Sequence, residues 1–532
     1  MRTLFRNAQC WSAGREIFDG ILVEGGIITA VGEDALTSMH DGIIDLDGAF
    51  LAPAFLDGHA HPIFAGREGA VGPKINGLIS LEKIVTAVHE FAVANPDAPW
   101  IIGGAYEAAL IEGGDFDAHW LDAVVRDRPV VLHAVDHHTI WVNSKALEIA
   151  GITGDTKDPN GGRISRRTDG TPQGTLREPA AISLILDKAP SDSVQNDVAA
   201  IARASAAYID AGVTTAIDSW VEKDMALAYL EAAKNGDLKI AMNLSFLAAP
   251  ATWRTKIEEF NGFRKEFEAL PDPTLVIANS IKFLADGALS AGTALLIEPY
   301  LDNPKSFGIK IWEDDELLNA LLTFDGLKYQ VHIHAIGDAA VKQGLDAIEE
   351  MVRVNPEWDR RPVIVHAQLI SDEDLPRFGQ LGVIANIQPL WAYLDPMNKE
   401  LILPRIGQAR NDRQYRLRSM LKNGAMIAFG SDWPVTSEKP LRALAVPIHR
   451  DSPDTPTGQG WNIAESITIE ESLTFYTANV AYQLFRENER GLLEIGMTAD
   501  FVVLDKDPLK IEPEEVASIT IKAVYQNGIK VR

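Results

Sequence analysis

The chain has 532 residues, of which 46% are hydrophobic and 23% are charged, so it can bury a large core and is too long for one small domain. Acidic residues outnumber basic ones by 75 to 49, and the charge of −26 argues against nucleic acid or an anionic membrane surface as a partner. A single cysteine, Cys10, excludes an internal disulfide framework and a thiolate metal cluster. The N-terminal segment lacks the apolar core of a signal peptide, and no apolar run reaches bilayer length, so we expect a cytoplasmic protein.

The two ends of the chain are rich in short β-type segments. Residues 20–32 contain two β-rich runs that flank a pair of glycines, a pattern typical of a hairpin. Residues 498–508 and 519–532 have the same character. Because chain termini often lie close together, residues 1–52 and 490–532 are predicted to form one discontinuous β-sandwich domain.

The middle of the chain, residues 53–489, alternates short apolar strands with amphipathic stretches. Such alternation indicates parallel pairing, and the number of repeats predicts an α/β fold, a (β/α)8 TIM barrel. The first gap is too long for one helix, so residues from about 66 to 198 are predicted to be a large insertion after strand 1. The eight predicted strands start at Leu51, Gly212, Lys239, Ser280, Tyr329, Pro362, Gly382 and Ala425.

Potential metal ligands stand where these strands end, which is where barrel enzymes carry their chemistry. Alone, a histidine there is more often a structural residue, and an aspartate is as often a turn or helix cap. The chain has only 12 histidines, however, so their concentration at strand ends favours a shared site. The residues are His59 and His61 on strand 1, Lys282 and Asp286 on strand 4, His332 and His334 on strand 5, His366 on strand 6 and Asp432 on strand 8.

Lys282 stands inside a β-rich run, where a free ammonium facing the barrel would be costly. Burial lowers the pKa of a lysine, and the neutral amine can react with CO2 to give a carbamate, a carboxylate-like ligand able to bridge two cations. A cation such as Zn²⁺ with an open position lowers the pKa of its water, and an aspartate beside it can take the proton. The pattern predicts attack of metal-bound hydroxide on an amide-like carbon.

Six motifs in order, "FLDGHAHP", "KFLADGAL", "VHIHAIGD", "VIVHAQLI", "AFGSDWPV" and "GLLEIGMTADFVVLD", resemble the amidohydrolase superfamily. The chain is most similar to the amidohydrolase-3 branch, which includes N-substituted formamide deformylases. The resemblance spans nearly the whole chain and implies one or two Zn²⁺ ions, or another divalent metal. It implies that one ion is bound by His59 and His61 and a second by His334 and His366, with Lys282 as a carbamylated bridging ligand and Asp432 as ligand and general base.

Further residues are candidates for substrate contact, each with a structural alternative. Residues on the insertion face the substrate or pack within the insertion, and Glu178 reaches the metals or is a first-turn helix acid. Asp286 hydrogen-bonds to the lysine-bearing strand or caps the next turn, and His332 is the weaker of its pair. The candidates are His138, Trp141, Asn143, Glu178, Asp286, His332, Gln388 and Trp391.

The resemblance has a departure at the segment after strand 4. The family usually continues with a Gly-Ser-Arg type of sequence, whereas this chain reads "DGALSAGTALL", so a family substrate should not be transferred. We expect a metal-dependent hydrolase acting on a non-peptide C–N bond, an amide or formamide, of a small organic molecule. A cyclic amidase, a deaminase and a non-catalytic metal-binding barrel remain alternatives, and a homodimer is compatible with the acidic surface.

Overall fold

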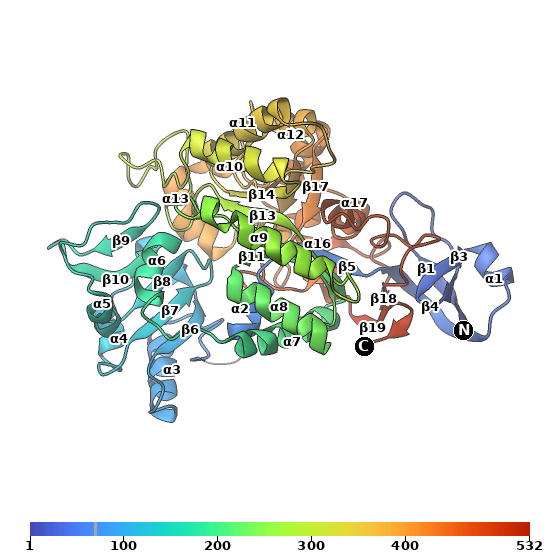
Figure 1. Ribbon diagram of the computed structural model, residues 1–532, viewed down its shortest axis with the longest axis horizontal. Coiled ribbons are helices and arrows are strands. Elements are labelled where there is room, and N and C mark those ends of the chain that lie inside the picture. The colour runs from blue at the N-terminus through green and yellow to red at the C-terminus, as the bar shows by residue number, and fades with distance from the viewer. Residues whose placement is uncertain (69–71) are drawn as a thin grey trace.

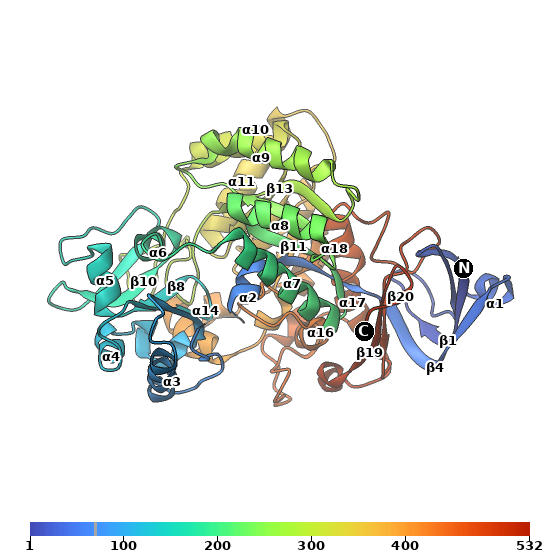
Figure 2. The ribbon, with the colours of Figure 1, turned by 60° about the horizontal axis from the view of Figure 1, so that its bottom comes forward.

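A computed structural model describes residues 1–68 and 72–532; residues 69–71, within the predicted insertion, lie outside the described part. Three bodies are arranged along the long axis of the molecule (Figure 1). A barrel of strands surrounded by helices lies in the middle, the sheet that joins the two termini lies at one end, and the insertion lies at the other. The second view gives the same order (Figure 2).

The central body is a sheet of eight parallel strands in the order β17-β16-β15-β14-β13-β12-β11-β5. This confirms the predicted TIM barrel. The predicted first strand is divided: residues Leu51 to Pro53 belong to the terminal sheet, and the barrel strand starts at Phe55. The barrel strands are β5 (Phe55–Ala60), β11 (Val213–Val221), β12 (Ala241–Leu247), β13 (Val276–Leu284), β14 (Gln330–Ala335), β15 (Val363–His366), β16 (Ile384–Ile387) and β17 (Met426–Phe429).

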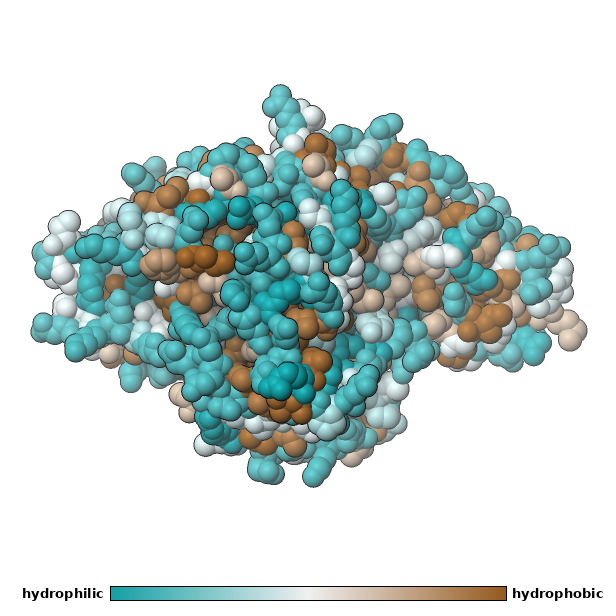
Figure 3. Space-filling view, turned by 90° about the horizontal axis from the view of Figure 1, so that it is seen from above, coloured by the Kyte–Doolittle hydropathy of each residue, from teal (hydrophilic) through white to brown (hydrophobic). Residues whose placement is uncertain are grey.

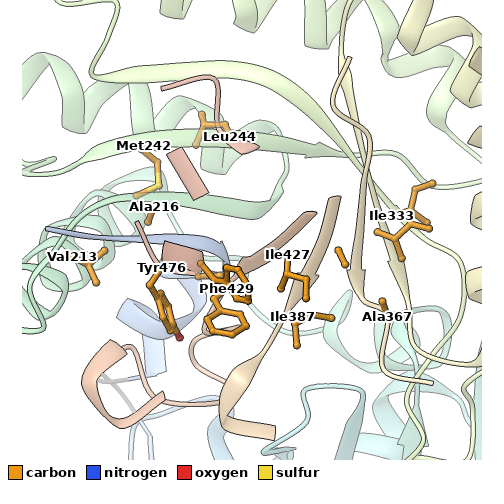
Figure 4. Packing of buried hydrophobic residues seen from close by; sticks show 14 of the residues in the cluster. Val213, Ala216, Met242, Leu244, Ile333, Ala367, Ile387, Ile427, Phe429 and Tyr476 are labelled. Atoms are coloured by element: carbon orange, nitrogen blue, oxygen red, sulfur yellow. The ribbon is translucent and has the colours of Figure 1, made fainter. Parts of the chain in front are cut away.

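The strands are almost continuously apolar because both of their faces are buried. Figure 4 shows side chains from several of them, among them Ile427 and Phe429 of β17, packed in one apolar cluster with Tyr476. The helices that cover the outside include α7 (Val194–Asp210), α8 (Lys223–Asn235), α9 (Trp253–Glu268), α10 (Asp314–Gly326), α11 (Asp338–Val354), α12 (Leu375–Leu381), α15 (Leu417–Lys422), α17 (Ile469–Phe475) and α18 (Ala478–Gln483).

The barrel closes between β5 and the segment that follows β17. Asp57 accepts hydrogen bonds from Ser431 N at 2.8 Å and Ser431 Oγ at 2.5 Å. Asp432 N donates to His59 O at 2.7 Å, and a Cβ on Gly430 would lie 2.6 Å from His59 N, so only glycine allows this approach. The motifs "FLDGHAHP" and "GSDWP" are therefore held against each other by their own backbone and by Asp57.

The terminal body is one seven-stranded sheet in the order β20-β19-β18-β4-β1-β2-β3, which unites both ends of the chain. The sheet bends back on itself: Ile28 N donates to Met497 O at 2.9 Å, and Ala499 N donates to Gly26 O at 2.8 Å. The predicted sandwich is thus formed by a single folded sheet. Its strands are β1 (Arg2–Cys10), β2 (Ile21–Glu24), β3 (Ile27–Val31), β4 (Gly42–Pro53), β18 (Phe501–Leu504), β19 (Ile521–Gln526) and β20 (Ile529–Lys530).

The insertion has its own sheet, in the order β6-β7-β8-β10-β9, and its own apolar core. It follows the short helix α2 (Pro62–Glu68) and precedes α7. Its elements are α3 (Leu81–Ala94), β6 (Ile101–Tyr106), α4 (Ala118–Asp122), β7 (Val130–Ala134), β8 (Thr139–Val142), α5 (Ser144–Ala150), β9 (Arg163–Arg166), β10 (Pro172–Arg177) and α6 (Pro179–Leu186).

The face of the molecule in Figure 3 is mainly hydrophilic. Figure 3 shows one face on which hydrophobic residues form small groups between polar ones. Within the part of the chain that the structure describes, every helix is too short or too polar to cross a bilayer.

Candidate metal centre and active site

His59, His61 and Asp432 converge at the carboxyl end of the barrel. Asp432 Oδ1 lies 3.2 Å from His59 Nε2 and 3.2 Å from His61 Nε2. The three side chains each offer a ligand atom within 4.8 Å of the others. The closure of the barrel produces this arrangement, because it fixes the backbone of β5 against the backbone of Asp432.

The protonation states of this group are those that a cation requires. Burial and the charge of Lys282 hold the pKa of His59 well below its usual value. Burial alone would raise the pKa of Asp432, but contacts with His59 and His61 outweigh it and hold that pKa well below normal. Neutral imidazoles beside an ionised carboxylate are the ligand forms that bind Zn²⁺.

His332 orients the His59 ring through Nδ1, the nitrogen that does not face Asp432. His59 Nδ1 and His332 Nε2 lie 3.1 Å apart, and the rings stack with centroids 5.3 Å apart. If Nδ1 carries the proton of this hydrogen bond, His59 Nε2 directs a lone pair at the Asp432 oxygen and has no hydrogen-bond partner. Two electron-rich atoms in this position repel each other unless a cation lies between them, so the group fits a metal.

His334 and His366 form a second group beside the first. Their ring centroids lie 4.5 Å apart, and His366 lies 5.1 Å from His59. His366 Nδ1 pairs with Gln388 Oε1 at 2.7 Å, and His334 Nε2 lies 3.3 Å from Gly287 O. Each ring therefore has one nitrogen held by a protein acceptor and the other free to bind a cation.

Lys282 lies close enough to both groups for its charge to act on the histidines of each. It pairs in register with His332 on the neighbouring strand, and its side chain is only 2% exposed. Burial lowers the pKa of Lys282 to about 7, although the charge of Asp432 opposes this shift. A substantial fraction of neutral amine is thus present at neutral pH.

His138 and Glu178 reach the site from the insertion. Glu178 is fully buried; its Oε2 lies 2.8 Å from His138 Nδ1, and its Oε1 accepts from the Thr293 hydroxyl. Burial alone would lower the pKa of His138, but the Glu178 carboxylate raises it to about 9. A Cβ at Gly287 would lie 2.1 Å from Glu178 Oε1, so this contact depends on a glycine after β13.

A cavity of about 120 Å³ adjoins these side chains. It includes Asp432 and His138, so a molecule bound in it would contact the metal-ligand group. The other residues that line it are Glu107, Val135, Asp136, Ala288, Leu289, Ser290, Ile336, Gln368, Trp391, Asp395, Met397, Asn398, Ile402, Tyr415, Val435 and Thr436.

Comparison with known proteins assigns the family. The model of the "Amidohydrolase family" matches residues 42–531, nearly the whole chain. The chain belongs to the amidohydrolase family.

Individual relatives agree with this assignment. The protein YtcJ of Bacillus subtilis (strain 168) is 30% identical, with 96% of this chain and 95% of YtcJ covered. The N-substituted formamide deformylase of Arthrobacter pascens is 25% identical, with 98% of this chain and 96% of that enzyme covered. The crystal structure of an uncharacterized metal-dependent hydrolase from Pyrococcus furiosus has a TM-score of 0.71 at 25% identity and covers 96% of this chain and 100% of that one. These similarities support a metal-dependent hydrolase, and His59, His61 and Asp432 form a candidate metal site in it.

Two predicted substrate residues of this amidohydrolase lie away from the cavity. Trp141 is fully buried in the core of the insertion and donates from Nε1 to Asp117 O at 3.0 Å. Asn143 caps α5, where its side chain accepts from Ala146 N at 3.0 Å and also bonds to three other backbone groups. Both residues serve the packing and hydrogen bonding of the insertion, and neither lines the described cavity.

Other candidates act through neighbours. Gln388 orients His366, whereas Trp391 stacks on the same ring at 5.2 Å and lines the cavity. Asp286 accepts backbone hydrogen bonds from Ile336, Gly337 and Leu295 at 2.8 to 3.0 Å, so it fixes the loops after β13 and β14 and does not line the cavity.

The loop after β13, where the sequence departs from the family pattern, is held by arginines from elsewhere in the chain. Arg405 donates to Ser290 O, while Arg163 and Arg177 donate to Ala291 O at 3.0 and 3.2 Å. Ser290 in turn donates from Oγ to Asp136 at 2.9 Å. These contacts hold the loop that forms one wall of the cavity.

We predict that His332→Phe weakens metal binding about 10- to 100-fold, the effect typical of losing the hydrogen-bond partner of a ligating histidine. Phenylalanine retains the ring stacked on His59 but removes the acceptor at 3.1 Å. Competition with a chelating dye measures the affinity, and thermal melting of the metal-free protein checks the fold. Unchanged affinity in a folded variant would show that His59 needs no such partner.

Proposed function

We propose that this amidohydrolase hydrolyses an amide or formamide C–N bond of a small organic molecule. The observation that supports this most strongly is the convergence of His59, His61 and Asp432, in neutral and ionised forms respectively, next to a cavity. The similarity to an N-substituted formamide deformylase favours a non-peptide amide.

In this proposal, His59, His61 and Asp432 would hold one divalent cation, and His334 and His366 would hold a second. A cation such as Zn²⁺ would lower the pKa of a water molecule and polarise the scissile carbonyl. Lys282 would supply a further oxygen ligand as a carbamate, formed when its neutral amine adds to CO2 and releases a proton.

The remaining steps belong to the side chains. Asp432 accepts the proton of the attacking water and passes it to the leaving nitrogen, as a positioned carboxylate can. His138 carries a proton at neutral pH because Glu178 raises its pKa, so its second nitrogen can donate a hydrogen bond to the carbonyl oxygen as negative charge develops.

Metal removal and replacement provide the test. We expect the purified protein to contain stoichiometric zinc or another divalent metal, and to hydrolyse members of a panel of N-formyl, N-acyl and cyclic amides. A chelator should abolish turnover, and the metal alone should restore it. Elemental analysis and product detection measure both.

The panel also separates the alternatives. Turnover confined to cyclic amides, or release of ammonia from a heterocycle, would replace the amidase proposal with a cyclic amidase or a deaminase. A protein without metal and without turnover on the whole panel would be a non-catalytic barrel.

A further inference from the structure

Three carboxylates outside the metal-ligand group line the cavity: Glu107, Asp136 and Asp395. Glu107 and Asp136 lie on the insertion, and Asp395 lies in the segment after β16. Among the described residues that line the cavity there is no lysine or arginine, and its one cationic side chain, His138, is paired with Glu178. None of the three carboxylates forms an ion pair within 4.0 Å with a described cation. Lys399, whose charge acts on Asp395, is exposed and does not line the cavity.

Two of these carboxylates, Glu107 and Asp395, accept a hydrogen bond from the described residues through only one of their two oxygens. Glu107 Oε1 accepts from Ala109 N at 3.3 Å, and Asp395 Oδ1 accepts from Asn398 N at 2.6 Å. The second oxygen of each receives no hydrogen bond from the described chain. Asp136 differs, because both of its oxygens are used, by His138 N at 3.1 Å and Ser290 Oγ at 2.9 Å.

The charges of the three groups act on one another. Burial and the charge of Asp136 raise the pKa of Glu107, although a backbone hydrogen bond opposes them. Burial and the charge of Glu107 raise the pKa of Asp395 to about 6, again against a backbone hydrogen bond. Like charges gathered in a partly desolvated space disfavour one another until a positive group joins them.

A separate observation also indicates a hydrogen-bond donor in the cavity. Asn398 lines it and is only 3% exposed, yet its side-chain oxygen is buried without a hydrogen-bond partner in the described chain. Such an acceptor is costly unless an N–H or O–H group reaches it. Trp391 and Tyr415 add aromatic surface, which attracts cations.

We propose that the substrate carries a positively charged nitrogen group, an ammonium, amidinium or guanidinium, which Glu107 and Asp395 bind while Asp432 faces the scissile bond. Asp136 adds negative charge and holds the loop at Ser290. This inference rests on the proposed function only where it says which end of the substrate is hydrolysed. The net charge of −26 would also concentrate cationic substrates around the protein.

Benzamidine and benzamide are a suitable pair of probes, because they have nearly the same shape and differ in charge. Calorimetry on the metal-loaded protein should show benzamidine binding at least about tenfold more tightly, the effect of one charge-assisted hydrogen bond. Glu107→Gln and Asp395→Asn should each reduce this preference by about tenfold or more. Glu112→Gln, which removes one exposed carboxylate of the same insertion, should leave it unchanged.

The binding result does not depend on turnover, so the two proposals fail separately. Preference for benzamidine without hydrolysis of any amide would retain the charge inference and overturn the amidase. Hydrolysis of neutral and cationic amides with equal kcat/KM, or equal binding of the two probes to the parent protein, would overturn the charge inference. The inference would also be overturned if Glu107→Gln or Asp395→Asn lost bound metal but still preferred benzamidine to benzamide. The two carboxylates would then serve the binding of a metal cation and not of the substrate.

Discussion

Asp432→Asn should lower kcat by about 10²- to 10⁴-fold, the usual contribution of a positioned general base, while most of the bound metal remains. The amide oxygen occupies the place of the carboxylate oxygen, 3.2 Å from both imidazoles, but it does not accept the proton of the attacking water. The barrel closure remains intact, because Asp432 contributes only its backbone N–H to that contact.

Rate and metal content of the same preparation provide the measurement. The matched control is Asp372→Asn, which removes a surface carboxylate paired with Arg416 and should alter neither quantity. An Asp432→Asn enzyme with kcat close to that of the parent would transfer the role of base to another group. If the variant lost metal as well as kcat, the main contribution of Asp432 would be metal binding, and this experiment would not test its role as the base.

Lys282→Ala should lower the metal content of the purified protein and reduce turnover by more than about 100-fold, beyond the loss seen when a ligand's neighbour is removed. The charge of Lys282 acts on both the His59–His61 pair and the His334–His366 pair, so a carbamate on its side chain could serve both. Truncation also leaves space next to the cations, so acetate or propionate should restore part of both quantities. Metal analysis and rate measurements with and without the acid test this.

Lys282→Met provides the comparison for packing. Methionine fills the volume of the buried chain without supplying nitrogen or oxygen, so the variant should keep the melting temperature of the metal-free parent while losing metal and rate. If Lys282→Met kept full metal content and full activity, the bridging role would be wrong.

The barrel could be predicted from the sequence because its physical requirements are local. Strands buried on both faces must be apolar runs, and a polar side chain at the end of such a run, as in His366, is conspicuous. The two segments that close the barrel stand out in the sequence as the motifs "FLDGHAHP" and "AFGSDWPV". The sequence does not show, however, that the carboxylate of Asp57 in the first accepts hydrogen bonds from Ser431 in the second.

The insertion could not be interpreted in this way. Trp141 and His138 lie three residues apart on the same motif, yet the first packs in the insertion core and the second lines the cavity. Only the pairing of β8 with β7 and β10 decides which side chain faces which way. Glu107 and Asp395 carry no sequence signal at all, because they reach the cavity from irregular segments far apart in the chain.

Glu178 lies at the junction between the part of the protein that holds the cation ligands and the part that encloses the cavity. One of its oxygens bonds to a histidine of the insertion, and the other bonds to a threonine of the barrel loop. A change in the insertion could therefore reshape the cavity and leave the cation ligands in place, provided that this carboxylate keeps both contacts. Chimeras that exchange insertions between relatives should tolerate the transfer only when the donor supplies its equivalent.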